Sequence, residues 1–180
     1  MKSLLIILLF FVYIKADVTY DFLNHLKKEN YEKACQVGKN IVSSPKADEK
    51  LISLVAQSCL KCDYIYALSA AQYRLRESKD GRADAVAFSS IILQKKLIYQ
   101  FMYDDTNIST MFLPVIEHPL SHTFVAIRDG NFSVVSKNPK IITFKKDDKH
   151  YRVFIDKADK GRVIIEIRDS KNNIDKRRYI

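Results

Sequence analysis

The spacing of the apolar residues constrains this chain of 180 residues more than any other feature, because it changes near residue 104. Between residues 20 and 103, apolar side chains recur every three or four positions, as in helices that bury one face. After residue 104 they alternate with polar residues, as in strands that bury one face. The chain is therefore predicted to be an α+β protein, with antiparallel helical hairpins followed by a small antiparallel β meander or barrel.

The predicted elements follow from these spacings and from the residues that interrupt them. Helices are expected at residues 20–28, 31–41, 48–60, 63–75 and 82–103. In the second part, residues 122–128 and 131–135 flank Asp129-Gly130, which is a strong signal for a hairpin with a two-residue turn. Further strands are expected at residues 141–146, 150–155, 162–168 and 174–180.

An unbroken apolar run at residues 4–14 follows the basic residue Lys2. The run is too short to cross ~30 Å of hydrocarbon as a helix, but it fits the apolar core of a signal peptide. We expect residues 1–16 to be a signal peptide, with a retained N-terminal membrane anchor as the alternative. The mature chain would then have a helical domain at 17–104 and an antiparallel β domain at 105–180, and it would be periplasmic or secreted.

Two short segments of the helical part align at an offset of 33 residues. Asn-Tyr-Glu-Lys-Ala at residues 30–34 matches Asp-Tyr-Ile-Tyr-Ala at residues 63–67, and each follows one predicted helix and begins another. Residues 18–77 thus resemble tetratricopeptide repeats, whose period is about 34 residues. The resemblance implies stacked helical hairpins that present a concave surface to a peptide or protein. An unrelated antiparallel helical bundle is the alternative.

The formal net charge of the chain is +9. Without residues 1–16 it is +7, of which +5 lies in residues 105–180. Three basic residues near the C-terminus, Lys176, Arg177 and Arg178, form a candidate basic patch. Such an excess either keeps the surface solvated or attracts an acidic protein or an anionic surface such as a membrane or glycan. Export argues against nucleic acid as the partner.

The three cysteines of an exported chain meet an oxidising compartment. Cys35 is expected early on one helix and Cys59 late on the next, and antiparallel packing would bring them together. A Cys35–Cys59 disulfide is therefore expected, with Cys35–Cys62 as the alternative, and either leaves one cysteine over. Cys59 and Cys62 also form a C-x-x-C pair, but at the end of a helix the thiol pKa would be raised, so thiol–disulfide chemistry is a minor alternative.

No catalytic set is recognisable in the sequence. Glu117, His118 and His122 are weak candidates for metal ligands, because Pro119 is expected to prevent a helical face that carries both histidines. The motifs of serine hydrolases, phosphate-binding loops and zinc proteases do not occur. We therefore expect a protein that is not an enzyme and holds no cofactor or metal.

Two segments fit the acidic-x-Asn-x-Ser/Thr pattern of bacterial periplasmic N-glycosylation. They are Asp-Thr-Asn-Ile-Ser around Asn107 and Asp-Gly-Asn-Phe-Ser around Asn131. One falls in the predicted linker and the other in a predicted hairpin turn, where a glycan could be attached. Coincidence is the alternative, because turns favour Asp, Asn and Ser in any case.

These features together predict an exported adaptor or scaffold that holds protein partners in a cell-envelope assembly. Periplasmic proteins that resemble tetratricopeptide repeats, in bacteria with this kind of glycosylation, include scaffold parts of the flagellar motor. A secreted effector or a glycan- or surface-binding module is the alternative, and the oligomeric state is not predicted.

Overall fold

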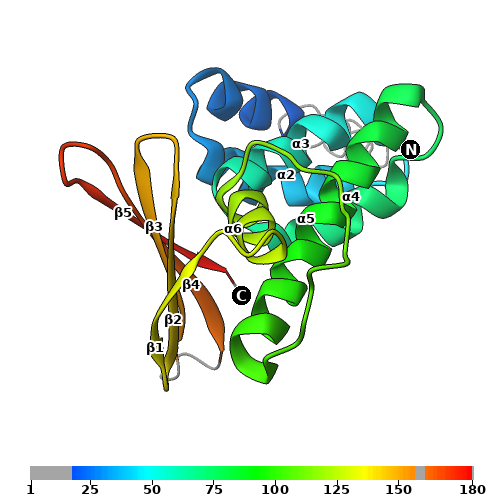
Figure 1. The fold of residues 1–180 in the computed structure, drawn as a ribbon. Helices are drawn as coiled ribbons and strands as arrows, with labels where there is room; N and C mark the ends of the chain where they lie inside the picture. Colours follow the sequence, from blue (N-terminus) through cyan, green and yellow to red (C-terminus); the bar gives the residue numbers. More distant parts are fainter. Residues whose placement is uncertain (1–17, 157–160, 180) are drawn as a thin grey trace, which may run out of the picture. The chain divides into compact units, whose positions relative to one another are not determined.

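A computed structural model describes residues 18–156 and 161–179 (Figure 1). The predicted signal peptide at residues 1–16 lies outside the described residues. The α+β class is confirmed, because a series of helices is followed by a five-stranded antiparallel sheet. The chain divides into two compact units, one ending at Ala85 and the other beginning at Val86. This boundary lies inside α5 (Lys79–Asp104), whereas the change of apolar spacing suggests residue 104.

The first unit is helical. It contains a helix at residues 18–27, α2 (Tyr31–Val42), α3 (Glu49–Lys61), the short 3-10 helix η1 (Ile65–Ala67), α4 (Leu68–Arg74) and the first turns of α5. Polar side chains begin two of these helices: Asn30 accepts from Lys33 N–H at 3.3 Å, and Asp48 accepts from Lys50 N–H at 2.8 Å. Large side chains buried in this unit include Phe22, Ile52, Leu68 and Leu75.

The turns after the helix at 18–27 and after α3 have the same backbone conformation. Glu29 and Asp63 both have positive φ angles, of 55° and 62°. Asn30 N–H donates to the carbonyl five residues earlier at 3.0 Å, and Tyr64 N–H does the same at 2.8 Å. This is a usual way for a helix to end when a left-handed residue follows it. The left-handed residues of the two turns, Glu29 and Asp63, are 34 residues apart. The sequence alignment has an offset of 33 because it matches the tyrosines of the two segments instead.

Helices α2 and α3 run antiparallel and approach each other closely. A Cβ atom on Gly38 would lie 2.6 Å from Val55 Cγ1, so the helices could not pack at this distance with a larger residue. The expected Cys35–Cys59 disulfide joins the same two helices, and Cys62 is a free thiol.

The second unit contains the rest of α5, α6 and the sheet. Its elements after α5 are α6 (Pro119–Arg128), β1 (Ser133–Lys137), β2 (Lys140–Lys146), β3 (Lys149–Asp156), β4 (Arg162–Arg168) and β5 (Ile174–Tyr179). Each strand pairs with the next one in antiparallel fashion, in the order β1-β2-β3-β4-β5. The result is an open meander rather than a closed barrel.

The hairpin predicted around Asp129-Gly130 is wrong, because residues 122–128 form most of α6. His118 caps this helix, since its Nδ1 accepts a hydrogen bond from a backbone N–H at 3.2 Å. Pro119 begins the helix instead of preventing it, because the first helical residue needs no N–H donor. Gly130, with a φ of 70°, ends the helix, so Asp129-Gly130 is a helix stop and β1 pairs with β2 instead.

One face of the sheet is covered and the other is exposed. Helix α6 lies against the covered face (Figure 1). The ring of His118, which caps this helix, packs there against the ring of Tyr179, with 5.8 Å between the ring centroids. Apolar side chains from the middle strands are buried on this face, including Ile142, Val153, Val163, Ile165 and Ile167. In the described ranges, no helix is both long enough and apolar enough to cross a membrane.

Candidate functional site

A groove of about 1120 Å³ opens in the helical unit. It is bounded by the loop at 45–48, by the first half of α3, by the segment at 73–78 and by the first turns of α5. Both signs of charge and one aromatic ring line it. The polar residues at the groove include Lys46, Lys50, Tyr73, Arg76, Asp80 and Asp84. We call this surface the helical groove.

The Glu49 carboxylate holds one side of the helical groove together. Its Oε1 accepts from the N–H groups of Arg76 and Glu77 at 2.5 and 2.7 Å, and its Oε2 accepts from the N–H and Oγ of Ser78 at 2.9 and 2.6 Å. The Ser78 hydroxyl and these N–H groups lower the pKa of Glu49 from 4.5 to about 2. Because Glu49 already fills this cluster of donors, the start of α5 is not open to an external anion.

The Arg74 guanidinium fixes the other side of the helical groove. It donates to the carbonyls of Val42 at 2.7 Å, of Ser44, of Pro45 at 3.4 Å and of Ala47 at 3.5 Å. These carbonyls lie at the end of α2 and in the loop that follows, where the helix itself leaves carbonyls without partners. The planar fork of arginine suits several acceptors at once. The walls of the groove are thus fixed before any ligand arrives.

The helical groove carries polar, charged and aromatic side chains that a ligand could contact. Ser53 Oγ donates to Asp84 Oδ2, and Gln57 Nε2 donates to Ser53 Oγ at 3.2 Å. The Tyr73 side chain is 72% exposed at the rim, and the Arg76 guanidinium lies 6.0 Å from its ring centroid. Tyrosine and arginine are enriched where proteins bind each other. Hydrogen bonds, both charges and an aromatic ring suit a polypeptide ligand.

A smaller groove of about 260 Å³ lies beside the disulfide. Alanine and serine side chains make up half of its lining residues, which also include Tyr64 and Tyr66. Cys59 is bonded to Cys35 rather than to Cys62, and burial raises the pKa of the Cys62 thiol. This pairing disfavours the thiol–disulfide alternative, because Cys59 and Cys62 do not form a redox pair.

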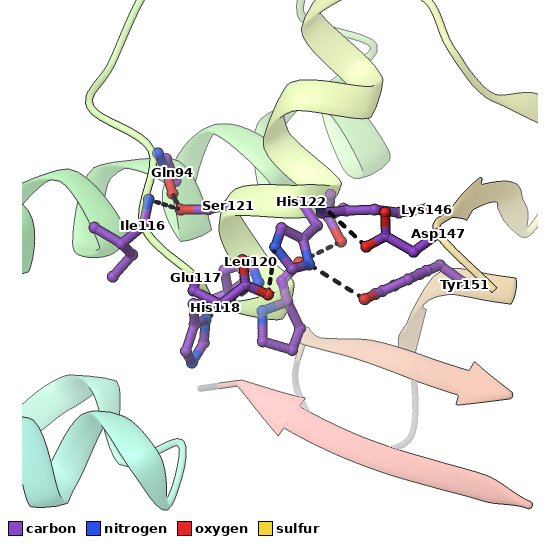
Figure 2. A network of polar contacts seen from close by, with 12 residues as sticks. Gln94, Ile116, Glu117, His118, Leu120, Ser121, His122, Lys146, Asp147 and Tyr151 are labelled. Carbon is purple, nitrogen blue, oxygen red and sulfur yellow. Dashed lines mark hydrogen bonds and ion pairs between the residues drawn. The ribbon is translucent and has the colours of Figure 1, made fainter. Parts of the chain in front are cut away.

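The weak metal candidates of the sequence lie around the start of α6 (Figure 2). His122 Nε2 is 3.2 Å from Glu117 Oε1, and His122 Nδ1 is 3.2 Å from Tyr151 Oη. With its proton on Nε2, His122 donates to Glu117 and accepts from Tyr151. His118 uses its Nδ1 to cap α6. No group of three or more potential metal ligands is found in the part of the chain that the structure describes.

The tyrosine–histidine–carboxylate series is buried at its centre. His122 and Tyr151 are 8% and 4% exposed, and the Tyr151 ring stacks on Phe144 at 4.6 Å. Burial lowers the pKa of His122 and raises the pKa of Tyr151, so both rings stay neutral at pH 7. The grooves described above are lined by other residues. The series therefore fastens α6 to β3 inside the second unit.

A second set of polar contacts in the same region ties α6 to α5 (Figure 2). Ser121 Oγ donates to Gln94 Oε1 at 2.6 Å and accepts from Ile116 N–H at 3.3 Å. Gln94 Nε2 donates to the Pro114 carbonyl at 2.8 Å. Every buried side-chain nitrogen and oxygen of the described residues has a partner, so this network is complete without a ligand.

The candidate basic patch lies on β5, which separates its members. Successive side chains of a strand point to opposite faces, so Lys176 and Arg178 share the exposed face of the sheet. Arg177 points to the other face, where it donates to Asp175 Oδ2 at 2.9 Å.

Both asparagines of the glycosylation pattern are exposed. Asn107 follows α5, and its Oδ1 accepts from Ser109 N–H at 3.0 Å. Asn131 lies between α6 and β1 rather than in a hairpin turn. Glycosylation at either position stays a prediction.

Sequence reasoning missed Glu49 and Arg74. Each bonds to backbone groups 27 to 32 residues away, so no local spacing marks them. A charged residue on the first or last turn of an amphipathic helix is common, and only the packing of the helices shows what these two residues hold.

Comparisons of this chain with protein-family models, with curated proteins and with solved structures found no match. The resemblance to tetratricopeptide repeats stays a prediction.

Proposed function

We propose that this protein is an exported adaptor that binds a segment of a partner protein in its helical groove. The groove itself carries the proposal. At about 1120 Å³ it exceeds the roughly 300–1,000 Å³ of small-molecule sites, which suits a stretch of polypeptide. Its walls are held by Glu49 and Arg74, so little conformational entropy is lost when a ligand binds.

Two further observations support this proposal. The Cys35–Cys59 disulfide suits an oxidising compartment, as expected for an exported chain. The turns repeated after 34 residues suit a short array of helical hairpins, an architecture whose surfaces bind peptides and proteins. We place the adaptor in a cell-envelope assembly, of which the scaffold of the flagellar motor is one candidate.

Photo-crosslinking in the native cell tests the groove. A photoreactive phenylalanine analogue in place of Tyr73 should give one discrete cross-linked product with an envelope protein. The same analogue in place of Tyr66, which is 76% exposed but lies outside the helical groove, should not give this product. Equal products from both positions would contradict a specific site in the groove.

A matched pair of charge variants sharpens the test. Lys46→Glu/Lys50→Glu reverses two charges at the helical groove and should abolish the product from Tyr73. Lys27→Glu/Lys28→Glu makes the same change at the end of another helix and should leave the product intact. A product that persists in the groove variant would overturn the proposed function.

A further inference from the structure

The exposed face of the sheet concentrates positive charge. The registers of β2, β3, β4 and β5 align the side chains in rows across the strands. In these rows the basic side chains on the exposed face are Lys145, Arg152, Arg162, Arg168, Lys176 and Arg178. The carboxylates in the same rows are Asp156 and Glu166, so six positive charges face two negative ones. We call this surface the basic face.

The two carboxylates leave most of this charge unbalanced. Asp156 lies directly opposite Arg162 in the register. Glu166 lies between Arg152 and Lys176, with its oxygens 2.8 Å from Arg152 Nη1 and 3.3 Å from Lys176 Nζ. Even with one cation assigned to each carboxylate, four cations remain on this face of the sheet.

Phe154 fixes two of the cations in place. The Arg152 guanidinium is 4.8 Å and the Lys176 Nζ is 5.5 Å from the centroid of its ring. Cations over an aromatic face are attracted by the ring and lose side-chain freedom. The charges are therefore partly ordered before an acidic ligand arrives, which reduces the entropy lost on binding.

We propose that the basic face binds an extended acidic segment of a partner protein. Lys176 and Arg178 are two residues apart on β5, hence about 7 Å apart along the strand. Alternate side chains of an extended peptide have this same spacing, and neighbouring strands add further cations in steps of about 4.8 Å. An extended segment that lies along β5 would thus bring two alternate acidic residues to Lys176 and Arg178, with the cations of the neighbouring strands beside it. Arginine binds carboxylates through paired hydrogen bonds.

The same observations disfavour a glycan or a bilayer as the ligand. The Phe154 ring already carries two cations, so it is not an open platform for a sugar ring. A bilayer surface binds proteins firmly when apolar side chains enter it. Among the described side chains of the basic face, Ile174 at the start of β5 is the one large apolar residue that is mostly exposed. This inference concerns a second surface and does not depend on the helical groove.

The test uses the mature chain and a fluorescein-labelled peptide of alternating glutamate and serine. Fluorescence anisotropy should detect binding at about 150 mM salt, where exposed charges are screened beyond about 8 Å. Lys145→Gln/Arg168→Gln/Arg178→Gln should weaken binding at least about tenfold, because it removes three cations and leaves the Arg152–Glu166–Lys176 contacts intact.

The control removes the same charge elsewhere. Lys27→Gln/Lys28→Gln/Lys33→Gln alters the helical unit and should change the affinity by less than about twofold. Equal losses in the two variants would mean that only net charge matters, and the inference would be overturned. The inference would also be overturned if dextran sulfate, or vesicles containing phosphatidylglycerol, bound through the same three residues more tightly than the acidic peptide does. Amide chemical shifts of the wild type give an independent readout: changes confined to β2–β5 support the basic face, and changes in the helices contradict it.

Discussion

Glu49 and Arg74 each satisfy several backbone groups that the helices of the first unit leave without partners. The N–H groups at 76–78 precede α5, and the carbonyls at 42–47 follow α2. Hydrogen bonds to an ionised group are roughly twice as strong as neutral ones. One carboxylate and one guanidinium can therefore fix two segments that contribute few hydrogen bonds of regular secondary structure. The helical groove lies between these two fixed segments, so its shape depends on both charges.

Glu49→Gln should lower the thermal unfolding temperature at neutral pH, because a neutral amide oxygen accepts these bonds less strongly. The folded pKa of Glu49 is about 2 against 4.5 in the free residue, so the folded state binds the proton less readily. The contribution of the carboxylate is complete above pH 4.5 and is lost as the pH falls through about 2. Wild type and variant should therefore converge toward pH 2, as measured by circular dichroism.

Glu77→Gln is the matched control for this experiment. It makes the same chemical change on a neighbouring exposed residue that contributes only its backbone N–H to the cluster. Its unfolding temperature should follow that of the wild type at each pH. If the unfolding temperatures of wild type and Glu49→Gln differed by the same amount at every pH, the role assigned to the carboxylate would be contradicted.

Among the secondary-structure elements, α6 shows where a sequence pattern becomes ambiguous. Its β-branched residues Thr123, Val125 and Ile127 alternate as in a strand, while its buried residues Leu120, Phe124 and Ile127 have helical spacing. The ends of the segment decide between the two, because a histidine–proline pair starts a helix and a left-handed glycine stops it.

The strand β4 lacks this ambiguity. β4 was predicted at 162–168 and is found at Arg162–Arg168, because alternation and the flanking turn residues agree there. The Cys35–Cys59 pair was also predicted, because antiparallel packing of two neighbouring helices brings these residues together, although the same packing left Cys35–Cys62 as an alternative. The helical groove and the basic face were not predictable. The first depends on contacts across about thirty residues, and the second on which residues of each strand share a face.

The packing of α6 on the sheet should depend on pH through His122. Burial lowers the pKa of His122 below the 6.5 of a free histidine, so the unfolded chain binds the proton more readily than the folded one. Stability should therefore be complete above about pH 6.5 and fall as the pH drops below it. Urea unfolding of the wild type between pH 5 and 7.5 should show this slope.

His122→Gln should flatten the slope and should also destabilise the protein by about 1–3 kcal/mol at pH 7.5, because the buried Tyr151 hydroxyl loses a well-placed acceptor. His150→Gln is the matched control, since His150 is exposed on the opposite face of the sheet. It should keep the slope of the wild type. A slope that persists in His122→Gln would assign the pH dependence to another group.

At the scale of the whole molecule, the two edge strands of the sheet affect how a ligand can bind to the basic face. An exposed edge strand invites pairing with another chain, and charged residues or bulges prevent it. β5 carries Lys176, Arg177 and Arg178, and β1 is interrupted by a shift of register between Val134 and Ser136. The charges of β5 thus protect the edge while two of them belong to the basic face. These positive charges oppose pairing with the same edge of a second copy of this chain, whereas they attract an acidic segment. Such a segment should bind on the face of the sheet, because the side chains of Lys176 and Arg178 point there.

The two units should also respond differently to reduction of the disulfide. The Cys35–Cys59 bond closes a loop of 24 residues, and its loss in Cys35→Ser/Cys59→Ser should cost about 3 kcal/mol. Both cysteines lie in the helical unit, so amide hydrogen exchange should accelerate there. The expected factor is about a hundred, because each 1.4 kcal/mol of free energy corresponds to about a tenfold change. Amides of β2, β3 and β4 should keep their protection. The control is Cys62→Ser, which leaves the disulfide intact and should change the exchange rates of neither unit.

If the sheet lost protection together with the helices, the two units would unfold as one. A binding defect from a helical variant could then no longer be assigned to the helical groove alone.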